Sequence, residues 1–144
     1  MRQAFAEAEA AAARGESPIG AAIFDAESGK IVASSGNRVE ELKDPTAHAE
    51  ILAIRAACAA AGAPRIPGLE IFVTLEPCAM CAAAIAGARL KRLTFSAYDP
   101  KGGGVEHGPR IFEQSTCNHR PEVVGGVDEQ RASELLRTFF RERR

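Results

Sequence analysis

The sequence lacks any long apolar run, since no stretch approaches the roughly 20 consecutive apolar residues that a membrane-spanning helix needs. We therefore expect no membrane association. Residues 1–17 also lack the unbroken apolar segment of a secretory signal, and they contain Glu7, Glu9 and Glu16, which argues against an acid-poor transit peptide. The expected location is cytoplasmic.

A strong net charge is absent too. The formal net charge is −1, so the chain as a whole gives no electrostatic sign of nucleic-acid binding. Residues 131–144 are the local exception, with five arginines against two glutamates and a net charge of +3. A solvated helix end, which favours cations near its C-terminus, explains this segment equally well.

Length and composition are those of an ordinary globular protein. Hydrophobic residues make up 46% of the 144 residues and charged residues 26%, unlike a disordered chain. We expect one domain spanning residues 1–144. Four cysteines could form two disulfides, but in a cytoplasmic chain metal binding or burial is favoured. They are Cys58, Cys78, Cys81 and Cys117.

Helical and strand patterns alternate along the chain, which predicts an α/β sandwich. Expected helices cover residues 2–14, 44–62, 76–90 and 128–142, and expected strands cover 20–25, 31–35, 69–75, 93–98 and 122–127. Asp44 and Pro45 resemble a helix cap and first helical residue, while residues 99–121 read as a long loop. Lys101 and the three glycines after it lack the spacing of a phosphate loop.

Cys78 and Cys81 stand three residues apart at the start of an expected helix. This spacing puts both sulfurs on one helix face, near the positive end of the helix dipole, where thiolates are favoured and can bind zinc. Alone, the pair is also compatible with a thioredoxin-like redox site or with two inert buried cysteines.

His48 and Glu50 lie near the start of another expected helix. Two helix starts that follow neighbouring strand ends can converge at one edge of the sheet, which would bring His48 to the cysteines. Three ligands leave one tetrahedral zinc position open, as in catalytic sites. Glu50, two residues after His48, could then serve as general base and acid.

The joint pattern His48-Ala49-Glu50 and Pro77-Cys78-Ala79-Met80-Cys81 matches the H-x-E and P-C-x-x-C signature of zinc nucleobase deaminases. The wider stretches DPTAHAEILAIR, VTLEPCAMCAAAI, DPKGGG, NHR and FFRERR resemble the bacterial tRNA-specific adenosine deaminases of the TadA type. The resemblance runs from PIGAAI through the C-terminal segment.

The resemblance implies a cytidine-deaminase-like three-layer α/β/α sandwich with a mixed sheet of about five strands. It implies hydrolytic deamination of adenosine to inosine at the wobble position of a tRNA anticodon, using zinc-activated water. The implied partners are a tRNA anticodon stem-loop and a second copy of the chain in a homodimer.

The resemblance also implies roles for individual residues. His48, Cys78 and Cys81 would bind zinc and Glu50 would transfer protons. Backbone N–H groups near Ala49 and Cys78 would help hold the water and the base. The residues that would touch the substrate are Asn37 at the base, and Asp99, Lys101, Asn118 and His119 at the flanking nucleotides.

Simpler explanations stay open for several of these residues. Asn37 could be a turn residue, and the four flanking contacts could be solvated loop side chains. Phe139, Phe140 and Arg141 could line a nucleic-acid path, but the phenylalanines are better explained as anchors of the last helix. Cys58 is most simply a small core residue, and His107 has no implied role.

Three rival functions are compatible with parts of the pattern. A deaminase of a free base or nucleoside, of the guanine, cytosine or adenine type, would use the same metal and glutamate. A non-catalytic zinc domain would use Cys117 or His119 as the fourth zinc ligand, and Glu50 would then have no function. A redox protein would leave both His48 and Glu50 unexplained.

Overall fold

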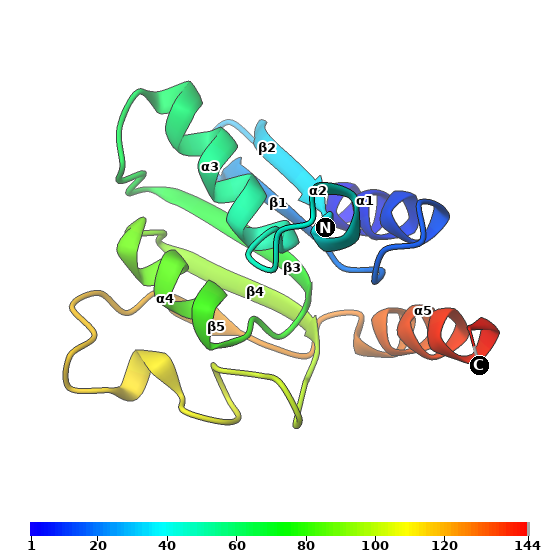
Figure 1. Ribbon diagram of the computed structural model, residues 1–144. Coiled ribbons are helices and arrows are strands. Elements are labelled where there is room, and N and C mark those ends of the chain that lie inside the picture. The colour runs from blue at the N-terminus through cyan, green and yellow to red at the C-terminus, as the bar shows by residue number, and fades with distance from the viewer. Residues whose placement is uncertain (144) are drawn as a thin grey trace.

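The computed structural model describes residues 1–143, so Arg144 of the basic C-terminal segment lies outside the described residues. Its centre is one sheet of five strands in the order β2-β1-β3-β4-β5 (Figure 1). The strands are β1 (Gly20–Asp25), β2 (Ile31–Gly36), β3 (Leu69–Leu75), β4 (Arg92–Ala97) and β5 (Glu122–Val124). Strand β1 is antiparallel to β2 and β3, whereas β3, β4 and β5 are parallel, so the expected mixed sheet is confirmed.

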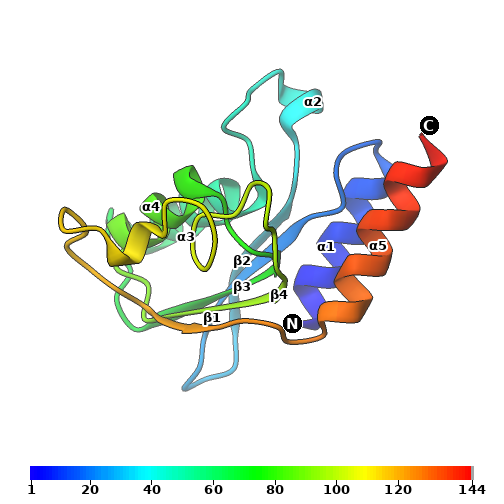
Figure 2. The same ribbon diagram turned by 90° about the horizontal axis from the view of Figure 1, so that it is seen from below.

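Helices cover both faces of this sheet and make the expected three layers. Helices α1 (Arg2–Ala13) and α5 (Glu129–Glu142) lie side by side on one face (Figure 2). Helices α3 (Ala49–Ala61) and α4 (Ala79–Gly87) lie on the other face, and the connections contain α2 (Val39–Leu42) and the short 3-10 helix η1 (Ile111–Glu113). No helix among residues 1–143 combines the length and apolar character needed to cross a bilayer.

The central strands are apolar on both faces because each face is covered. In β3, Ile71 and Val73 belong to the core beneath α3 and α4, while Phe72 between them belongs to the core beneath α1. Successive side chains of a strand point to opposite faces, so one continuous apolar run serves both layers. The apolar run therefore predicts the strand, but it does not indicate which of the two cores each side chain joins.

The start of α3 differs from the sequence-based prediction. Asp44 and Pro45 do not open the helix; the Asp44 carboxylate accepts hydrogen bonds from the Thr46 N–H (2.8 Å) and hydroxyl (2.7 Å), which forms a turn. Helix α3 begins at Ala49, and His48 is its N-cap residue. The predicted end is confirmed, since Gly62 caps the helix with φ of 66°. Because the helix starts later than predicted, His48 lies at its N-terminus and not inside it.

Helix α1 lies so close to β1 that only glycine fits at position 20. A Cβ on Gly20 would overlap the Ala4 carbonyl oxygen and approach the Ala8 nitrogen to 2.7 Å. We expect Gly20→Ala to lower the free energy of unfolding by about 1–3 kcal/mol, because α1 must move away from the sheet. The midpoint of urea unfolding measures the change.

Gly87→Ala is the matched control, because a Cβ there meets no atom within 4 Å and its φ is not positive. Alanine favours the helical backbone, so this variant should unfold at the wild-type urea concentration or slightly above it. Equal midpoints for the Gly20 and Gly87 variants would show that the α1 contact is not tight.

Candidate metal centre and active site

Segments that follow β2, β3 and β4 gather at one edge of the sheet. Asn37 follows the last residue of β2, Cys78 comes three residues after β3 ends, and Asp99 comes two residues after β4 ends. The ends of β3 and β4 are neighbours, since Leu75 pairs with Ala97. Helices α3 and α4 also contact each other, and their first turns supply His48, Glu50 and Cys81.

His48, Cys78 and Cys81 form one group of possible metal ligands, here called the metal group or ligand group. All their ligand atoms lie within 4.8 Å of one another. The Nδ1 atom of His48 lies 3.7 Å from Cys78 Sγ and 3.5 Å from Cys81 Sγ. A tetrahedral zinc ion with ordinary Zn–S and Zn–N bond lengths holds sulfur and nitrogen about 3.6 Å apart. The two soft sulfurs and one imidazole therefore fit zinc in both chemistry and spacing.

The two thiols have opposite proton affinities. A hydrogen bond from Cys81, supported by His48, lowers the pKa of Cys78 to about 4 despite partial burial. The same hydrogen bond, together with burial, raises the pKa of Cys81. One thiolate is thus already favoured at neutral pH, and a metal cation would take the place of the remaining thiol proton.

Glu50 lies in the first turn of α3, is only 4% exposed and is not a member of the ligand group. Burial raises the pKa of its carboxyl above the usual range, and attraction to His48 offsets only part of this effect. A raised pKa strengthens the carboxylate as a base, which favours taking a proton from a neighbouring group. The position suits proton transfer next to the metal group.

Asn37 and Ala49 lie at the same edge as the metal group. Asn37 is only 8% exposed, and its backbone is held by its N–H bond to Ile19 and by the Arg14 guanidinium on its carbonyl. Asn37 is therefore a buried residue whose backbone is held in place. Ala49 is the first residue of α3, where a backbone N–H has no partner inside the helix.

Asp99 and Lys101 stand on the loop that follows β4. The Asp99 carboxylate accepts hydrogen bonds from the backbone N–H groups of Lys101 (3.2 Å) and Gly102 (3.0 Å), so it shapes its own loop. The Lys101 side chain is exposed. The loop leaves β4 where this strand ends beside β3, which is the sheet edge that also carries Cys78.

Asn118 and His119 lie at the opposite edge of the sheet, where the parallel strands begin. They precede β5, which starts beside the first residue of β4, because Arg92 pairs with Glu122. The His119 Nε2 atom lies 2.7 Å from the carbonyl oxygen of Leu90, beyond the C-terminal end of α4. The nine residues of α4, roughly 13 Å of helix, therefore separate this histidine from the metal group.

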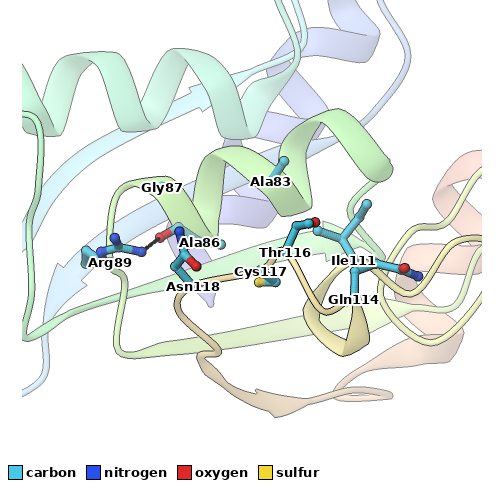
Figure 3. Close-up of a pocket in the computed structure, with 9 residues that line it drawn as sticks. All are labelled: Ala83, Ala86, Gly87, Arg89, Ile111, Gln114, Thr116, Cys117 and Asn118. Carbon is cyan, nitrogen blue, oxygen red and sulfur yellow. Dashed lines mark hydrogen bonds between the residues drawn. The ribbon is translucent and has the colours of Figure 1, made fainter.

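A surface cavity of about 370 Å³ runs along α4 between the helix and residues 111–118 (Figure 3). Neither the metal group nor Glu50 lines it. The lining residues are Ala83, Ala86, Gly87, Arg89, Ile111, Gln114, Thr116, Cys117 and Asn118. The cavity is therefore separate from the chemical site.

The remaining two cysteines stay outside the ligand group. Cys117 lies 3.2 Å from the carbonyl oxygen of His119 and packs against the core, so it does not close the metal site as a fourth ligand. Cys58 packs against the same core, as expected, and its sulfur lies 3.7 Å from the Pro64 carbonyl oxygen.

Sequence reasoning missed Glu76, which stands between β3 and Cys78 with its side chain fully buried. Burial opposes ionisation of this carboxyl, but hydrogen bonds from the backbone of Asp99, Glu106 and His107 and from the His107 ring keep its pKa below the usual range. The available signal was an acidic residue placed directly after a largely apolar strand and two residues before Cys78.

Comparison with known proteins identifies the class. The model of the MafB19-like deaminases matches residues 1–144, and the chain belongs to this deaminase family. A tRNA-specific adenosine deaminase of Agrobacterium fabrum is 54% identical over 145 residues, which cover 100% of this chain and 93% of the relative. Within the deaminases, the chain therefore belongs with the tRNA-specific adenosine deaminases.

Solved structures agree with this assignment. A structure from a study of tRNA:A34 deaminases superposes with a TM-score of 0.91 at 53% identity, covering 94% of this chain and 97% of that one. A guanine deaminase from Nitrosomonas europaea is more distant, with a TM-score of 0.77 at 25% identity over 94% of this chain and 80% of that one. The redox and non-catalytic alternatives are therefore rejected.

The ligand assignment predicts metal content. Cys78→Ala removes one of two sulfurs from the group and should reduce bound zinc from about one per chain to a small fraction, since the two remaining ligands hold zinc poorly. Cys58→Ala is the control, because this thiol is outside the group. Elemental analysis of both purified variants decides the matter: full zinc in Cys78→Ala would disprove the assignment.

Proposed function

We propose that this protein deaminates adenosine to inosine at the wobble position of a tRNA anticodon. The observation that carries the proposal is the meeting of His48, Cys78 and Cys81 with the buried Glu50 at one sheet edge. Relatives named as tRNA-specific adenosine deaminases match the whole chain and support this choice of substrate. We also propose that residues 1–144 act as a single domain in the cytoplasm.

We propose zinc as the metal, held by the Nδ1 atom of His48 and the sulfurs of Cys78 and Cys81. When bound, zinc would supply a Lewis acid that makes water acidic enough to act as a nucleophile near neutral pH. The 3.5 and 3.7 Å nitrogen–sulfur distances support this metal, since they match the edges of a zinc tetrahedron.

Glu50 would move the protons. Its carboxylate would take a proton from the attacking water and give it to N1 of adenine while the oxygen forms its bond to C6. The same carboxyl would then pass the second proton of that water to the C6 amino group, which leaves as ammonia as the C–N bond breaks. Burial helps because it favours the protonated form between these transfers.

The target base must leave its stack to reach the metal group. An anticodon loop is single-stranded, so unstacking there costs less than in a duplex. The Asn37 side chain and the N–H of Ala49 would hold the extruded base, since both lie at the same sheet edge as Glu50. Asp99 and Lys101 would contact the flanking nucleotides from the loop after β4.

For Asn118 and His119 to contact RNA, the RNA must extend beyond the metal group, because both residues lie at the far end of α4. We propose that they contact RNA only when it crosses between two copies in a homodimer. Exposed Met80 and the cavity along α4 give this helix an accessible face for a second copy. The arginines of α5 would add attraction to phosphate.

A free-base deaminase is the second candidate, because a guanine deaminase shares the fold at a TM-score of 0.77. The tRNA proposal is better supported, since 53% identity to a tRNA:A34 deaminase structure extends over 94% of this chain.

Glu50→Gln keeps the size of the side chain but removes its ability to carry a proton. We expect turnover to fall about 10²–10⁴-fold, the usual effect of losing a general acid–base group. Zinc content should stay near one per chain, because Glu50 is outside the ligand group. Parallel measurement of ammonia release and zinc content tests both expectations.

Glu70→Gln is the control for this variant, because Glu70 is also a buried glutamate but bonds to Arg92 at the other end of β3. It should retain turnover. Activity of Glu50→Gln close to that of the control would reject the proton-transfer role, and a loss of zinc would make Glu50 a ligand or a support of the site.

The substrate proposal predicts a preference that ammonia release can measure. An adenosine-bearing anticodon stem-loop should be deaminated faster than adenine, guanine, cytosine or their nucleosides at equal enzyme concentration, because only the RNA supplies flanking contacts. Its binding should weaken as salt rises, since phosphate contacts release counterions. Faster turnover of any free base or nucleoside would overturn the tRNA proposal and leave the deaminase class intact.

A further inference from the structure

The buried carboxylate of Glu76 accepts five hydrogen bonds from a single loop, residues 99–107. Its Oε1 accepts from the Asp99 backbone N–H (3.0 Å) and lies 2.8 Å from the His107 Nδ1. Its Oε2 accepts from the backbone N–H groups of Val105 (3.2 Å), Glu106 (2.9 Å) and His107 (3.1 Å). Both ends of the loop are thus tied to one side chain.

The middle of the loop, residues 102–104, consists of three glycines. A Cβ on Gly103 would overlap Glu76 Oε2, and a Cβ on Gly104 would approach the Ala79 nitrogen to 2.5 Å. The Gly104 N–H also bonds to the Pro77 carbonyl at 2.8 Å. The glycines therefore let the loop lie directly against the start of α4, beside the metal group.

We propose that Glu76 is a positioning residue that fixes the 99–107 loop, and with it Asp99 and Lys101, beside the metal group for RNA binding. The proposal rests on the proposed function for its effect on substrate. Its structural part, the anchoring of the loop, can be tested without any activity. Glu76 itself neither belongs to the ligand group nor reaches solvent.

Glu76→Gln tests the anchor without changing its size. Every backbone partner of Glu76 is an N–H donor, and the amide nitrogen of glutamine is a donor as well. In either orientation that nitrogen faces at least one backbone N–H, which loses its acceptor. A buried carboxylate that accepts several N–H bonds has no neutral isosteric substitute.

Glu70→Gln is the matched control, because Glu70 is a buried glutamate on the adjoining strand β3 whose partner is the Arg92 side chain. It removes a buried charge of the same kind at the end of β3 away from the site. His107→Ala gives an intermediate case, since it deletes one of the five bonds and leaves the carboxylate and the backbone donors in place.

Hydrogen exchange followed by mass spectrometry reads the anchor directly. In Glu76→Gln, peptides covering residues 99–107 should exchange at least about tenfold faster than in the wild type, as expected for loss of a bond to a buried charge. Peptides covering β3 should be unchanged, and Glu70→Gln should leave the loop protected. Wild-type protection of the loop in Glu76→Gln would overturn the proposal.

Kinetics then test the effect on substrate. With the anticodon stem-loop, Glu76→Gln should raise KM about tenfold or more, with a smaller change in kcat and unchanged zinc content. His107→Ala should raise KM less. A fall in kcat with KM unchanged, or an equal effect of Glu70→Gln, would show a merely structural role. If the wild-type protein does not act on the stem-loop, the proposed function fails, while the exchange result still decides whether Glu76 anchors the loop.

Discussion

The site depends on the meeting of two helix starts at one edge of the sheet. Because β3 and β4 are parallel and end side by side, the segments that follow both strands emerge at the same edge. Helix α4 begins directly after β3, and α3 crosses the same face to bring His48 within 3.7 Å of both sulfurs. Ligand spacing, and therefore the choice of metal, follows from strand pairing and helix packing.

Two buried glutamates near this edge show how surroundings decide what a carboxyl does. Glu50 is buried with too few hydrogen bonds to offset the loss of water, so its pKa rises and it suits proton transfer. Glu76 is surrounded by N–H donors, so its pKa falls and it remains an acceptor that ties a loop in place. The same type of side chain thus suits proton transfer in one position and the support of a loop in the other.

The metal group and the segments around it contribute to different aspects of function, namely the type of reaction and the choice of substrate. The proposed metal ligands and Glu50 would set the reaction, in agreement with the signature of zinc nucleobase deaminases. They say nothing about the size of the substrate, because a guanine deaminase shares this fold. We propose that selection comes from the loop after β4, from Asn37 and from α5. A tRNA-specific adenosine deaminase matches the whole of this chain at 54% identity, which supports an RNA substrate.

The sequence by itself predicted the element order and the grouping of His48, Cys78 and Cys81, which the structure brings together, because periodicity and ligand spacing depend on neighbouring residues. The proton-transfer role that it assigned to Glu50 stays a prediction. It predicted the start of α3 wrongly, since whether Asp44 caps a helix or a turn depends on its surroundings. Only the tertiary structure showed that Asn118 and His119 lie at the far end of α4 from the metal group, and that Glu76 accepts five hydrogen bonds from the 99–107 loop. Those facts depend on contacts between segments 20 or more residues apart, which no local pattern records.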